Sequence, residues 1–349
     1  MHVTTKPLIG IMANSLQPWP LYDLTKTQEF DLLVFTVKGI NWTQETITGL
    51  SLENDIWKEI ALPFPSVIYN RLYSSNLALS KTIEAAIGEG KVFNYITNFN
   101  KWTIYNTLRQ SRVKEFLPKT YLYHKINFLE LLNHEKVLIL KPCKSYFGRQ
   151  VYLIKLINNS KFQLCRNTNF PKIITTDVNY FNNVVHSLIN KRFIVQQFIE
   201  LNKINNKIYD IRIFVQKNIK GQWTVSGGLS RISFANYYIT NFCSKVIGLN
   251  SLLESNIIST GTLEQIHNIS LYVAKIIETK LVHLGDISVD FGLDTQGKPW
   301  IIEINGKTQK SLVFKTNDEN LIRATYLKPL EYACFLANNK MRETGAGPC

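Results

Sequence analysis

An acid and an amide interrupt an apolar segment near residue 300. The stretch "WIIEINGK" (300–307) has the composition of a strand, in which successive side chains point to opposite faces. This alternation predicts that Ile301, Glu303 and Asn305 share one face and that the intervening isoleucines take the other. An acid and an amide on one face can serve a metal, a hydrogen-bond network or solvent.

A second acidic segment precedes this stretch. The apolar residues of "DISVDFGLD" (286–294) alternate with polar ones, which places Asp290 on the polar face of a predicted strand. The turn "DTQGKP" joins the two strands as a hairpin if Gly297 takes the positive φ angle that a short turn requires. Asp290 then lies close to Glu303 and Asn305, so that two carboxylates and an amide carbonyl converge.

Two interpretations fit this hairpin. Hard cations such as Mg²⁺ prefer oxygen ligands and often bind one or two carboxylates together with substrate phosphates. Alternatively, the hairpin lies on the surface and its polar face contacts water. The neighbouring apolar residues Ile301, Ile302 and Ile304 favour burial, and unpaired buried carboxylates are costly. A bound cation would remove that cost.

Upstream segments carry groups that a nucleotide requires. Lys141 ends the apolar strand "VLILK" and precedes a turn with Gly148 and Arg149, where a lysine and backbone N–H groups can surround a phosphate. The segment "QQFIE" (196–200) has backbone groups for an adenine edge, with Glu200 near the ribose. Each signal is weak alone, because many strands end in a solvated lysine and 196–200 also fits a plain apolar strand end.

The elements that position these residues follow from the apolar pattern. Strands alternating with helical segments predict a small α/β domain over residues 1–95. A helix is expected over 100–117, capped by Asn100. The other expected elements are strands at 7–13, 31–37, 66–70, 193–200, 209–217, 223–233, 286–293 and 299–305, a hairpin over 136–156, helices at 76–90, 177–190 and 263–280, and a C-terminal amphipathic helix broken near Pro329.

Composition narrows the class of protein. The 349 residues are 45% hydrophobic and 19% charged, which is typical of a folded soluble protein. The net charge of +14 favours anionic partners, but the basic residues are scattered, so that specific nucleic-acid binding is not expected. Five cysteines without a CxxC pair indicate a reducing compartment. With no signal peptide and no membrane span expected, the expected location is the cytoplasm.

Several motifs together resemble a known superfamily. The stretches "NKWTIYNTLRQ", "LILKPCKSYFGRQVYLIKL", "FIVQQFIE", "YDIRIFV", "GGLSRIS" and "DISVDFGLDTQGKPWIIEING" occur in the order found in the ATP-grasp superfamily. They are most similar to its YheC/YheD branch, which is associated with the endospore coat. The similarity extends over nearly the whole chain and is densest from about 100 to 310.

This resemblance implies a fold and an activity. The implied fold is an ATP-grasp fold of the α+β or α/β class, preceded by an N-terminal α/β domain at 1–95. Residues 96–195 would carry the phosphate loop, 196–340 the Mg²⁺ site, and 341–349 a flexible tail. The implied enzyme is a ligase that transfers the γ-phosphate of ATP to a small-molecule or peptide carboxylate. An amine or thiol then attacks the acylphosphate, and ADP and phosphate are released, without a nucleic acid or a membrane as partner.

The resemblance also implies roles for individual residues. Lys101 and Lys141 match phosphate-contacting lysines, beside Gly148 and Arg149 of the phosphate loop. The remaining matches are Gln197 and Ile199 as adenine contacts through their backbones, Glu200 as a ribose contact, Arg212 and Arg231 as catalytic positions that hold phosphate or the acyl substrate, and Asp290, Glu303 and Asn305 as ligands of Mg²⁺, expected as two ions.

Departures from the family pattern leave other hypotheses open. Lys144 stands where relatives often have glycine in the phosphate loop, which also holds the bulky Tyr146 and Phe147. The acceptor segment keeps Thr240 and Asn241 but lacks a Gly-Gly pair. The second hypothesis is therefore a non-catalytic structural or binding protein associated with the spore coat. A third, nucleic-acid binding, rests on the net charge alone.

Overall fold

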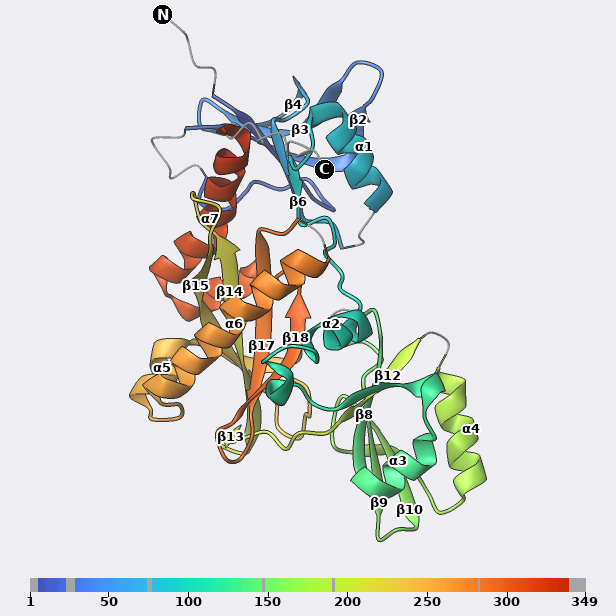
Figure 1. The fold of residues 1–349 in the computed structure, drawn as a ribbon. Coiled ribbons are helices and arrows are strands. Elements are labelled where there is room, and N and C mark those ends of the chain that lie inside the picture. Colours follow the sequence, from blue (N-terminus) through green and yellow to red (C-terminus); the bar gives the residue numbers. More distant parts are fainter. Residues whose placement is uncertain are drawn as a thin grey trace, which may run out of the picture.

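Three sheets of six strands organise the chain, one after another along the sequence (Figure 1). The structure is a computed structural model and describes residues 6–22, 29–73, 77–145, 148–189, 192–281 and 283–338. The expected tail at 341–349 and the bulky pair Tyr146 and Phe147 lie outside these residues. The N-terminal sheet, the middle sheet and the C-terminal sheet each have their own hydrophobic core.

The N-terminal sheet has the strand order β4-β3-β2-β1-β5-β6, in which β2, β1, β5 and β6 are parallel. Its elements are β1 (Leu8–Met12), β2 (Asp31–Asn41), β3 (Thr46–Glu53), β4 (Ile56–Pro63), β5 (Val67–Asn70), helix α1 (Leu77–Ile87) and β6 (Val92–Phe93). The strands expected at 7–13, 31–37 and 66–70 and the helix at 76–90 are confirmed. The sequence did not reveal the antiparallel hairpin β3–β4, because its edge strand β4 has no buried residue and so lacks a clear apolar face.

Helix α2 (Lys101–Leu108) leads from the N-terminal sheet to the middle sheet. The Asn100 side chain caps it as expected and accepts from the N–H groups of Trp102 and Thr103 at 3.0 and 3.2 Å. The expected extension to residue 117 is wrong. The Ser111 hydroxyl donates to the Leu108 carbonyl at 2.7 Å, and such a local bond competes with the helical pattern.

The middle sheet is antiparallel throughout, in the order β11-β10-β9-β8-β12-β7. Its elements are the 3-10 turns η1 (Lys114–Phe116) and η2 (Tyr123–Lys125), strands β7 (Thr120–Leu122), β8 (Val137–Pro142), β9 (Tyr152–Ile157), β10 (Lys161–Arg166), β11 (Pro171–Thr175) and β12 (Phe193–Gln197), and helices α3 (Phe128–Glu135) and α4 (Val178–Leu188). The hairpin expected over 136–156 is confirmed as β8–β9, and the helix expected at 177–190 as α4. The strand expected over 193–200 ends at Gln197.

The C-terminal sheet is also antiparallel, in the order β16-β15-β14-β17-β18, with the short β13 beside β14. Its elements are β13 (Lys203–Ile204), β14 (Lys207–Lys217), β15 (Trp223–Ser233), β16 (Cys243–Gly248), α5 (Leu249–Glu254), α6 (Thr260–Lys280), β17 (Asp286–Leu293), β18 (Pro299–Asn305), the 3-10 segment η3 (Lys310–Thr316) and α7 (Glu319–Asn338). The expected strands are confirmed, and the helix expected at 263–280 begins three residues earlier. Gly297 has φ +81° in the β17–β18 turn, as expected.

Helices α6 and α7 cover opposite faces of the C-terminal sheet. On one face, Ile211 and Val289 pack in the core that contains α6. On the other, Phe214 and Leu229 join a core formed with α7 and the N-terminal strands. Figure 1 shows α7 running from the C-terminal sheet to the N-terminal sheet. We propose three domains built on the three sheets, with α7 shared between two of them.

Helix α7 continues through Pro329, so the expected break is wrong. Proline lacks the N–H that would bond to the carbonyl four residues earlier, which is that of Thr325. In this chain the Thr325 carbonyl accepts from Gln216 Nε2 at 2.9 Å and from Lys310 Nζ at 2.7 Å. Side chains from the C-terminal sheet and η3 therefore replace the missing helical bond.

The buried Asp286 carboxylate joins the N-terminal and C-terminal sheets. It accepts from the Tyr69 hydroxyl, from Gln216 Nε2 at 3.0 Å and from Lys310 Nζ at 2.9 Å, and Arg71 Nη1 lies 3.6 Å away. Tyr69 and Arg71 are contributed by the end of β5. These contacts fix the N-terminal domain against the strand that carries Asp290.

His283 has a structural role at the same joint. Its Nδ1 lies 2.8 Å from the Val92 carbonyl oxygen and its Nε2 lies 2.6 Å from the Tyr332 hydroxyl, to which Lys217 Nζ donates at 3.1 Å. Burial, reinforced by the charge of Lys217, lowers the pKa of His283 to about 4. The imidazole is therefore neutral in the folded protein at neutral pH.

This geometry predicts a pH-dependent loss of stability. Between about pH 6.5 and pH 4 the unfolded chain protonates His283 and the folded chain does not, so the free energy of unfolding should fall by about 3 kcal/mol. Urea denaturation across this pH range should show a smaller decrease in the free energy of unfolding for His283→Gln than for wild type. The exposed control His124→Gln should retain the wild-type decrease. Parallel curves for wild type and His283→Gln would contradict the prediction.

Candidate functional site

Two cavities meet beside β18. The hinge pocket, about 110 Å³, lies between the middle sheet, the 238–241 loop and β18. The basic pocket, about 430 Å³, lies between the C-terminal sheet, the N-terminal domain and the segment 307–311. The two pockets share four lining residues, which are Lys101, Ser145, Asn241 and Glu303. A ligand in one pocket would therefore meet a ligand in the other at these side chains.

The hinge pocket has apolar walls and a backbone N–H, that of Ile199, which is available to a ligand. Its apolar lining consists of Ile139, Val151, Phe198, Ile199, Leu201, Ile239 and Ile302. The Gln197 N–H donates to the Lys119 carbonyl at 2.8 Å. Among the hydrogen bonds of the described residues, none uses the Ile199 N–H. Apolar walls with an unpaired N–H suit a flat aromatic ring that has an acceptor on its edge.

Lys141 brings a buried positive charge to this pocket from β8. Its exposed fraction is 8%, and no carboxylate of the described residues forms an ion pair with it. Burial, followed by repulsion from Lys101, lowers the pKa of Lys141 to about 8, although Glu303 opposes this. A buried cation without an anionic partner is costly, so that this position favours an anionic ligand.

Lys101 stands at the junction of the two pockets, at the start of α2. Its Nζ lies 3.0 Å from Glu303 Oε1 and donates to the carbonyl and hydroxyl oxygens of Ser145, both at 3.2 Å. The cap by Asn100 fixes the first turn of α2 and with it the direction of this side chain. Lys101 and Lys141 thus approach Glu303 from two different elements, and their predicted contacts with phosphate remain predictions.

A network of charged residues forms the floor of the basic pocket. Arg212 Nε and Nη2 donate to the two oxygens of Asp290, each at 2.7 Å. Arg231 Nη2 donates to Asp290 at 2.9 Å, and Arg231 also forms a two-point pair with Asp210. Burial raises the pKa of Asp290, but the charges of Arg212 and Arg231 outweigh it and lower the pKa below its usual value. Asp290 is therefore ionised and firmly held.

A bulge in β18 sets the directions of its side chains. Asp290 is opposite Glu303 and Ser288 is opposite Asn305, but Phe291 is opposite Ile301, so that Ile302 is an extra residue. The prediction that Ile301 shares a face with Glu303 is wrong, because Ile301 and Ile304 both enter the core. Ile302 and Glu303 instead both line the hinge pocket.

The role of Asp290, Glu303 and Asn305 as Mg²⁺ ligands stays a prediction, but the hairpin register places the three residues side by side, as expected. Their oxygen atoms suit a hard cation, and Glu303, 24% exposed at its side chain, is the more accessible carboxylate. Asp290 is enclosed by its arginines, and Asn305 Nδ2 lies 3.4 Å from it. Among the described residues, no three His, Cys, Asp or Glu side chains cluster as a metal site. The donor chemistry fits Mg²⁺ with Glu303 and Asn305 at the pocket and Asp290 behind them.

Of the other predicted site residues, Gly148 lines a pocket and two others do not. Gly148 lines the hinge pocket with φ +65°, and a Cβ there would lie 3.0 Å from Asn241 Oδ1. Arg149 and Glu200 are exposed and are not among the described residues that line either pocket. Their predicted contacts with phosphate and ribose remain predictions.

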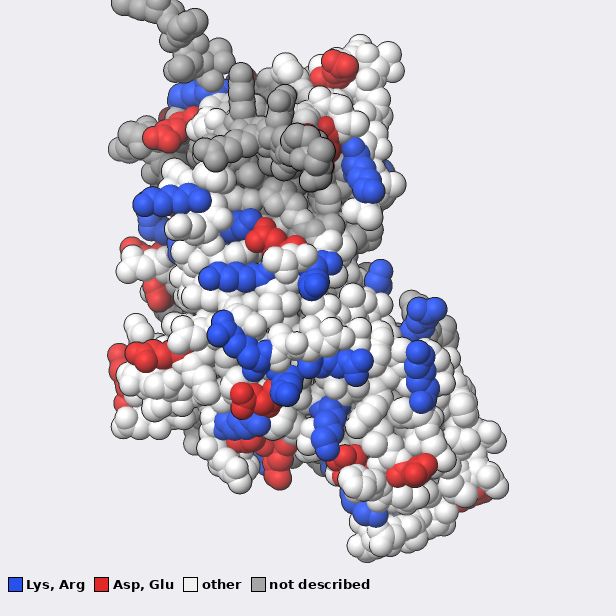
Figure 2. Space-filling model, in the orientation of Figure 1, with Lys and Arg blue, Asp and Glu red and all other residues white. Residues whose placement is uncertain are grey.

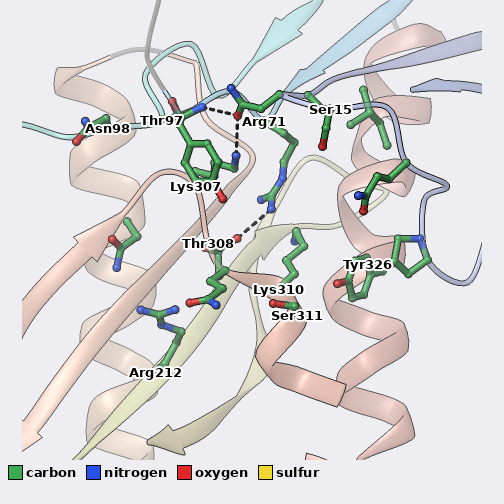
Figure 3. A pocket seen from close by; sticks show the side chains of 18 of the residues that line it. Ser15, Arg71, Thr97, Asn98, Arg212, Lys307, Thr308, Lys310, Ser311 and Tyr326 are labelled. Atoms are coloured by element: carbon green, nitrogen blue, oxygen red, sulfur yellow. Dashed lines mark hydrogen bonds between the residues drawn. The ribbon is translucent and has the colours of Figure 1, made fainter. Parts of the chain in front are cut away.

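Sequence reasoning gave no site role to three basic side chains, one directly after β5 and two in the segment 307–310. Arg71, Lys307 and Lys310 line the basic pocket (Figure 3). Burial, with a contribution from Arg71, lowers the pKa of Lys307 to about 7. The available signal was that Arg71 directly follows β5, since ligand sites lie at the carboxyl ends of parallel strands.

Comparison with known families gives a clear assignment. The sequence model of the YheC/D-like ATP-grasp family matches residues 89–336, which is more than half of the chain and contains both lysines and the β17–β18 hairpin. The chain belongs to this family. The resemblance seen in its motifs and the ATP-grasp fold are thereby confirmed.

The following relatives and structures are similar to this ATP-grasp protein. It is 29% identical over 323 residues to the endospore coat-associated protein YheD of Bacillus subtilis, covering 87% of this chain and 70% of YheD. The VanG D-Ala:D-Ser ligase of Enterococcus faecalis aligns with a TM-score of 0.55 and 13% identity, over 95% of this chain and all of that one. N5-carboxyaminoimidazole synthetase of Staphylococcus aureus, complexed with ADP, aligns with a TM-score of 0.56 and 10% identity. The alignment covers 92% of this chain and 76% of that one. These structures show a shared fold.

The Asp290 network predicts a difference in stability between two site variants. Asp290→Asn leaves Arg212 buried without its carboxylate, so the free energy of unfolding should fall by about 3–5 kcal/mol. Glu303→Gln loses a partly exposed pair with Lys101 and should cost about 1 kcal/mol or less. Urea denaturation at pH 7 measures both values. If the two variants lost the same free energy of unfolding, the prediction that the buried pair contributes more than the partly exposed pair would be wrong.

Proposed function

We propose that this ATP-grasp protein is an ATP-dependent ligase that joins a carboxylate to an amine or a thiol. The observation that carries the proposal is the junction of two pockets at Lys101 and Glu303. A nucleotide in the hinge pocket would present its terminal phosphate at the site where a carboxylate in the basic pocket begins. Phosphoryl transfer depends chiefly on such positioning and on neutralised charge.

The hinge pocket would bind ATP. The Ile199 N–H would donate to the adenine edge, and the Gln197 backbone and the Glu200 carboxylate would contact adenine and ribose. Lys141 and Lys101 would contact the phosphates, because Lys141 has no ion-pair partner among the described residues and Lys101 stands at the pocket junction. The turn with Gly148 and Arg149 would cover the phosphates. A structure that shares the fold, the Staphylococcus aureus synthetase, is complexed with ADP, which supports an adenine nucleotide as the ligand.

Asp290, Glu303 and Asn305 would hold Mg²⁺, as two ions by resemblance to the family. Bound magnesium supplies charge neutralisation for the phosphates during transfer. The chain's own contribution is to fix Asp290 between Arg212 and Arg231 and to leave Glu303 accessible to both pockets.

The proposed reaction has two steps. A carboxylate oxygen attacks the γ-phosphorus, the bond from that phosphorus to ADP breaks, and an acylphosphate forms. The amine nitrogen or thiol sulfur then attacks the acyl carbon, phosphate leaves, and the nucleophile loses a proton. Arg212 and Arg231 line the basic pocket and would stabilise the negative charge of the carboxylate and of the departing phosphate.

A non-catalytic structural or binding protein is the second candidate. Two features favour it: the glycine-poor turn after Lys141, and the relative's description as endospore coat-associated. In that case the location would be the spore rather than the cytoplasm. Nucleic-acid binding is less supported, since basic side chains on the face shown in Figure 2 are interrupted by acidic ones. Among the described residues, no helix is long and apolar enough to span a membrane.

Release of ADP from Mg-ATP tests the proposed function directly. Wild type should release ADP in the presence of at least one carboxylate–nucleophile pair, drawn from a panel of carboxylates, amines and thiols. Glu303→Gln should lower the rate at least a hundredfold while the chain stays folded, because Glu303 faces both pockets.

The control is Glu130→Gln, which changes an exposed glutamate on α3 and should leave the rate unchanged. Wild-type turnover in Glu303→Gln would overturn the ligase assignment. ATP binding without turnover on any pair would favour the structural candidate.

Binding of ATP can be tested separately at Lys141. Lys141→Met removes a buried cation that no described carboxylate pairs with, so the melting temperature without ligand should stay the same or rise. The affinity for ATP should fall at least tenfold, because the lysine would form a charged hydrogen bond to phosphate. Thermal shift with increasing ATP measures both effects, and Lys161→Met, an exposed change on β10, is the control. Unchanged ATP affinity in Lys141→Met would exclude this lysine as a phosphate contact.

A further inference from the structure

The basic pocket has a second group of cations, away from its junction with the hinge pocket. Figure 3 shows Arg71 and Lys307 together on one side, near Thr308, whereas Arg212 lies on the other. Arg71 and Thr308 belong to different halves of the chain and are joined by a bond of 2.9 Å from Arg71 Nη2 to the Thr308 carbonyl. Because cations lie at both ends of the pocket, one ligand could place a different anionic group at each end.

Most cations of the pocket already have a carboxylate partner. Lys101 pairs with Glu303, and Arg212 and Arg231 pair with Asp290 and Asp210. These pairs balance the end of the pocket that adjoins the hinge pocket.

Of the three remaining cations, two share a single carboxylate. Arg71 and Lys310 both face Asp286, at 3.6 and 2.9 Å. Lys307 forms no ion pair with any described residue, and its contacts are neutral: Asn14 Oδ1 at 3.0 Å and the Tyr73 ring, with Nζ 3.1 Å from the centroid. This end of the pocket therefore carries an excess of positive charge.

The same end offers a buried hydroxyl, that of Thr308. Thr308 is fully buried and lines the basic pocket, and its Oγ1 has no hydrogen-bond partner among the described residues. A buried polar atom without a partner is costly unless a ligand satisfies it. Its position next to Lys307 and opposite Arg71 provides a donor for an anion.

We propose that the carboxylate substrate carries a second anionic group, a carboxylate or a phosphate, which binds between Arg71 and Lys307. The reacting carboxylate would lie at the Arg212 end, and this assignment of the two ends rests on the proposed function. Arg71 is held in place by Tyr69, Thr308 and Asp286, so that little ordering is required when an anion binds. The pocket volume of about 430 Å³ is suited to a small molecule.

The test compares acids that differ by one anionic group. Isothermal titration calorimetry without ATP, at fixed ionic strength, would measure glutarate against pentanoate and 3-phosphoglycerate against glycerate. At least one of the two doubly anionic acids should bind about tenfold or more tightly than its partner, and which of them does distinguishes carboxylate from phosphate.

Substitutions at Lys307 locate the preference, because this residue lies outside the Asp286 network that holds the domains together. Lys307→Met should abolish the preference, and Lys307→Arg should retain it. Lys315→Met, an exposed change on the same η3 segment as Lys310, should leave it intact. The absence of any preference in wild type, or its persistence in Lys307→Met, would overturn the inference.

Parallel measurement of ADP release separates this inference from the proposed function. A preference that depends on Lys307 without ADP release would support the anion site and count against the ligase. ADP release with monoacids and no preference for doubly anionic acids would support the ligase and overturn the anion site.

Discussion

A charge in the interior of a protein must be surrounded by partners, and Asp286 shows how much structure this requirement can determine. Its carboxylate contacts Tyr69 of β5 and Arg71 directly after it, Gln216 of β14 and Lys310 of η3. The N-terminal sheet, the C-terminal sheet and the segment after β18 therefore meet at one point. Any relative movement of these three parts would expose or separate the buried charge, at a cost of several kcal/mol. The basic pocket inherits its shape from this joint.

Strand β17 connects Asp286 to the candidate site, because it also carries Asp290. Asp286 and Asp290 lie on the same face of the strand, and both pair with residues of the neighbouring β14, Gln216 and Arg212. One polar face thus carries the anchor of the N-terminal domain at one end and the arginine-bound carboxylate at the other. The opposite face is wholly apolar and packs against α6. The alternation of polar and apolar residues along β17 therefore places the hydrophobic core on one face of the strand and the candidate site on the other.

That alternation is why so much could be predicted from the sequence. It placed Asp290 beside Glu303, and the glycine at 297 fixed the register of the hairpin. It could not show the bulge at Ile302, because an inserted residue leaves the apolar composition unchanged. Nor could it show Arg71 in the pocket, since that contact joins residues far apart in the chain. The end of α2 at Leu108 depends on a bond from the Ser111 hydroxyl, and the continuity of α7 depends on bonds from Gln216 and Lys310 to the Thr325 carbonyl; local propensity reveals neither.

The proline in α7 has a consequence for how this sequence can vary. An alanine at position 329 would be ranked as an improvement by helix propensity, since it restores the N–H that the helix lacks. The restored N–H would compete for the Thr325 carbonyl with Gln216 and Lys310, which reach it from outside the helix. A more regular helix would then loosen the segment that carries Lys307 and Thr308. Local regularity and a well-ordered pocket are therefore in conflict at this position, and the irregular residue favours the pocket.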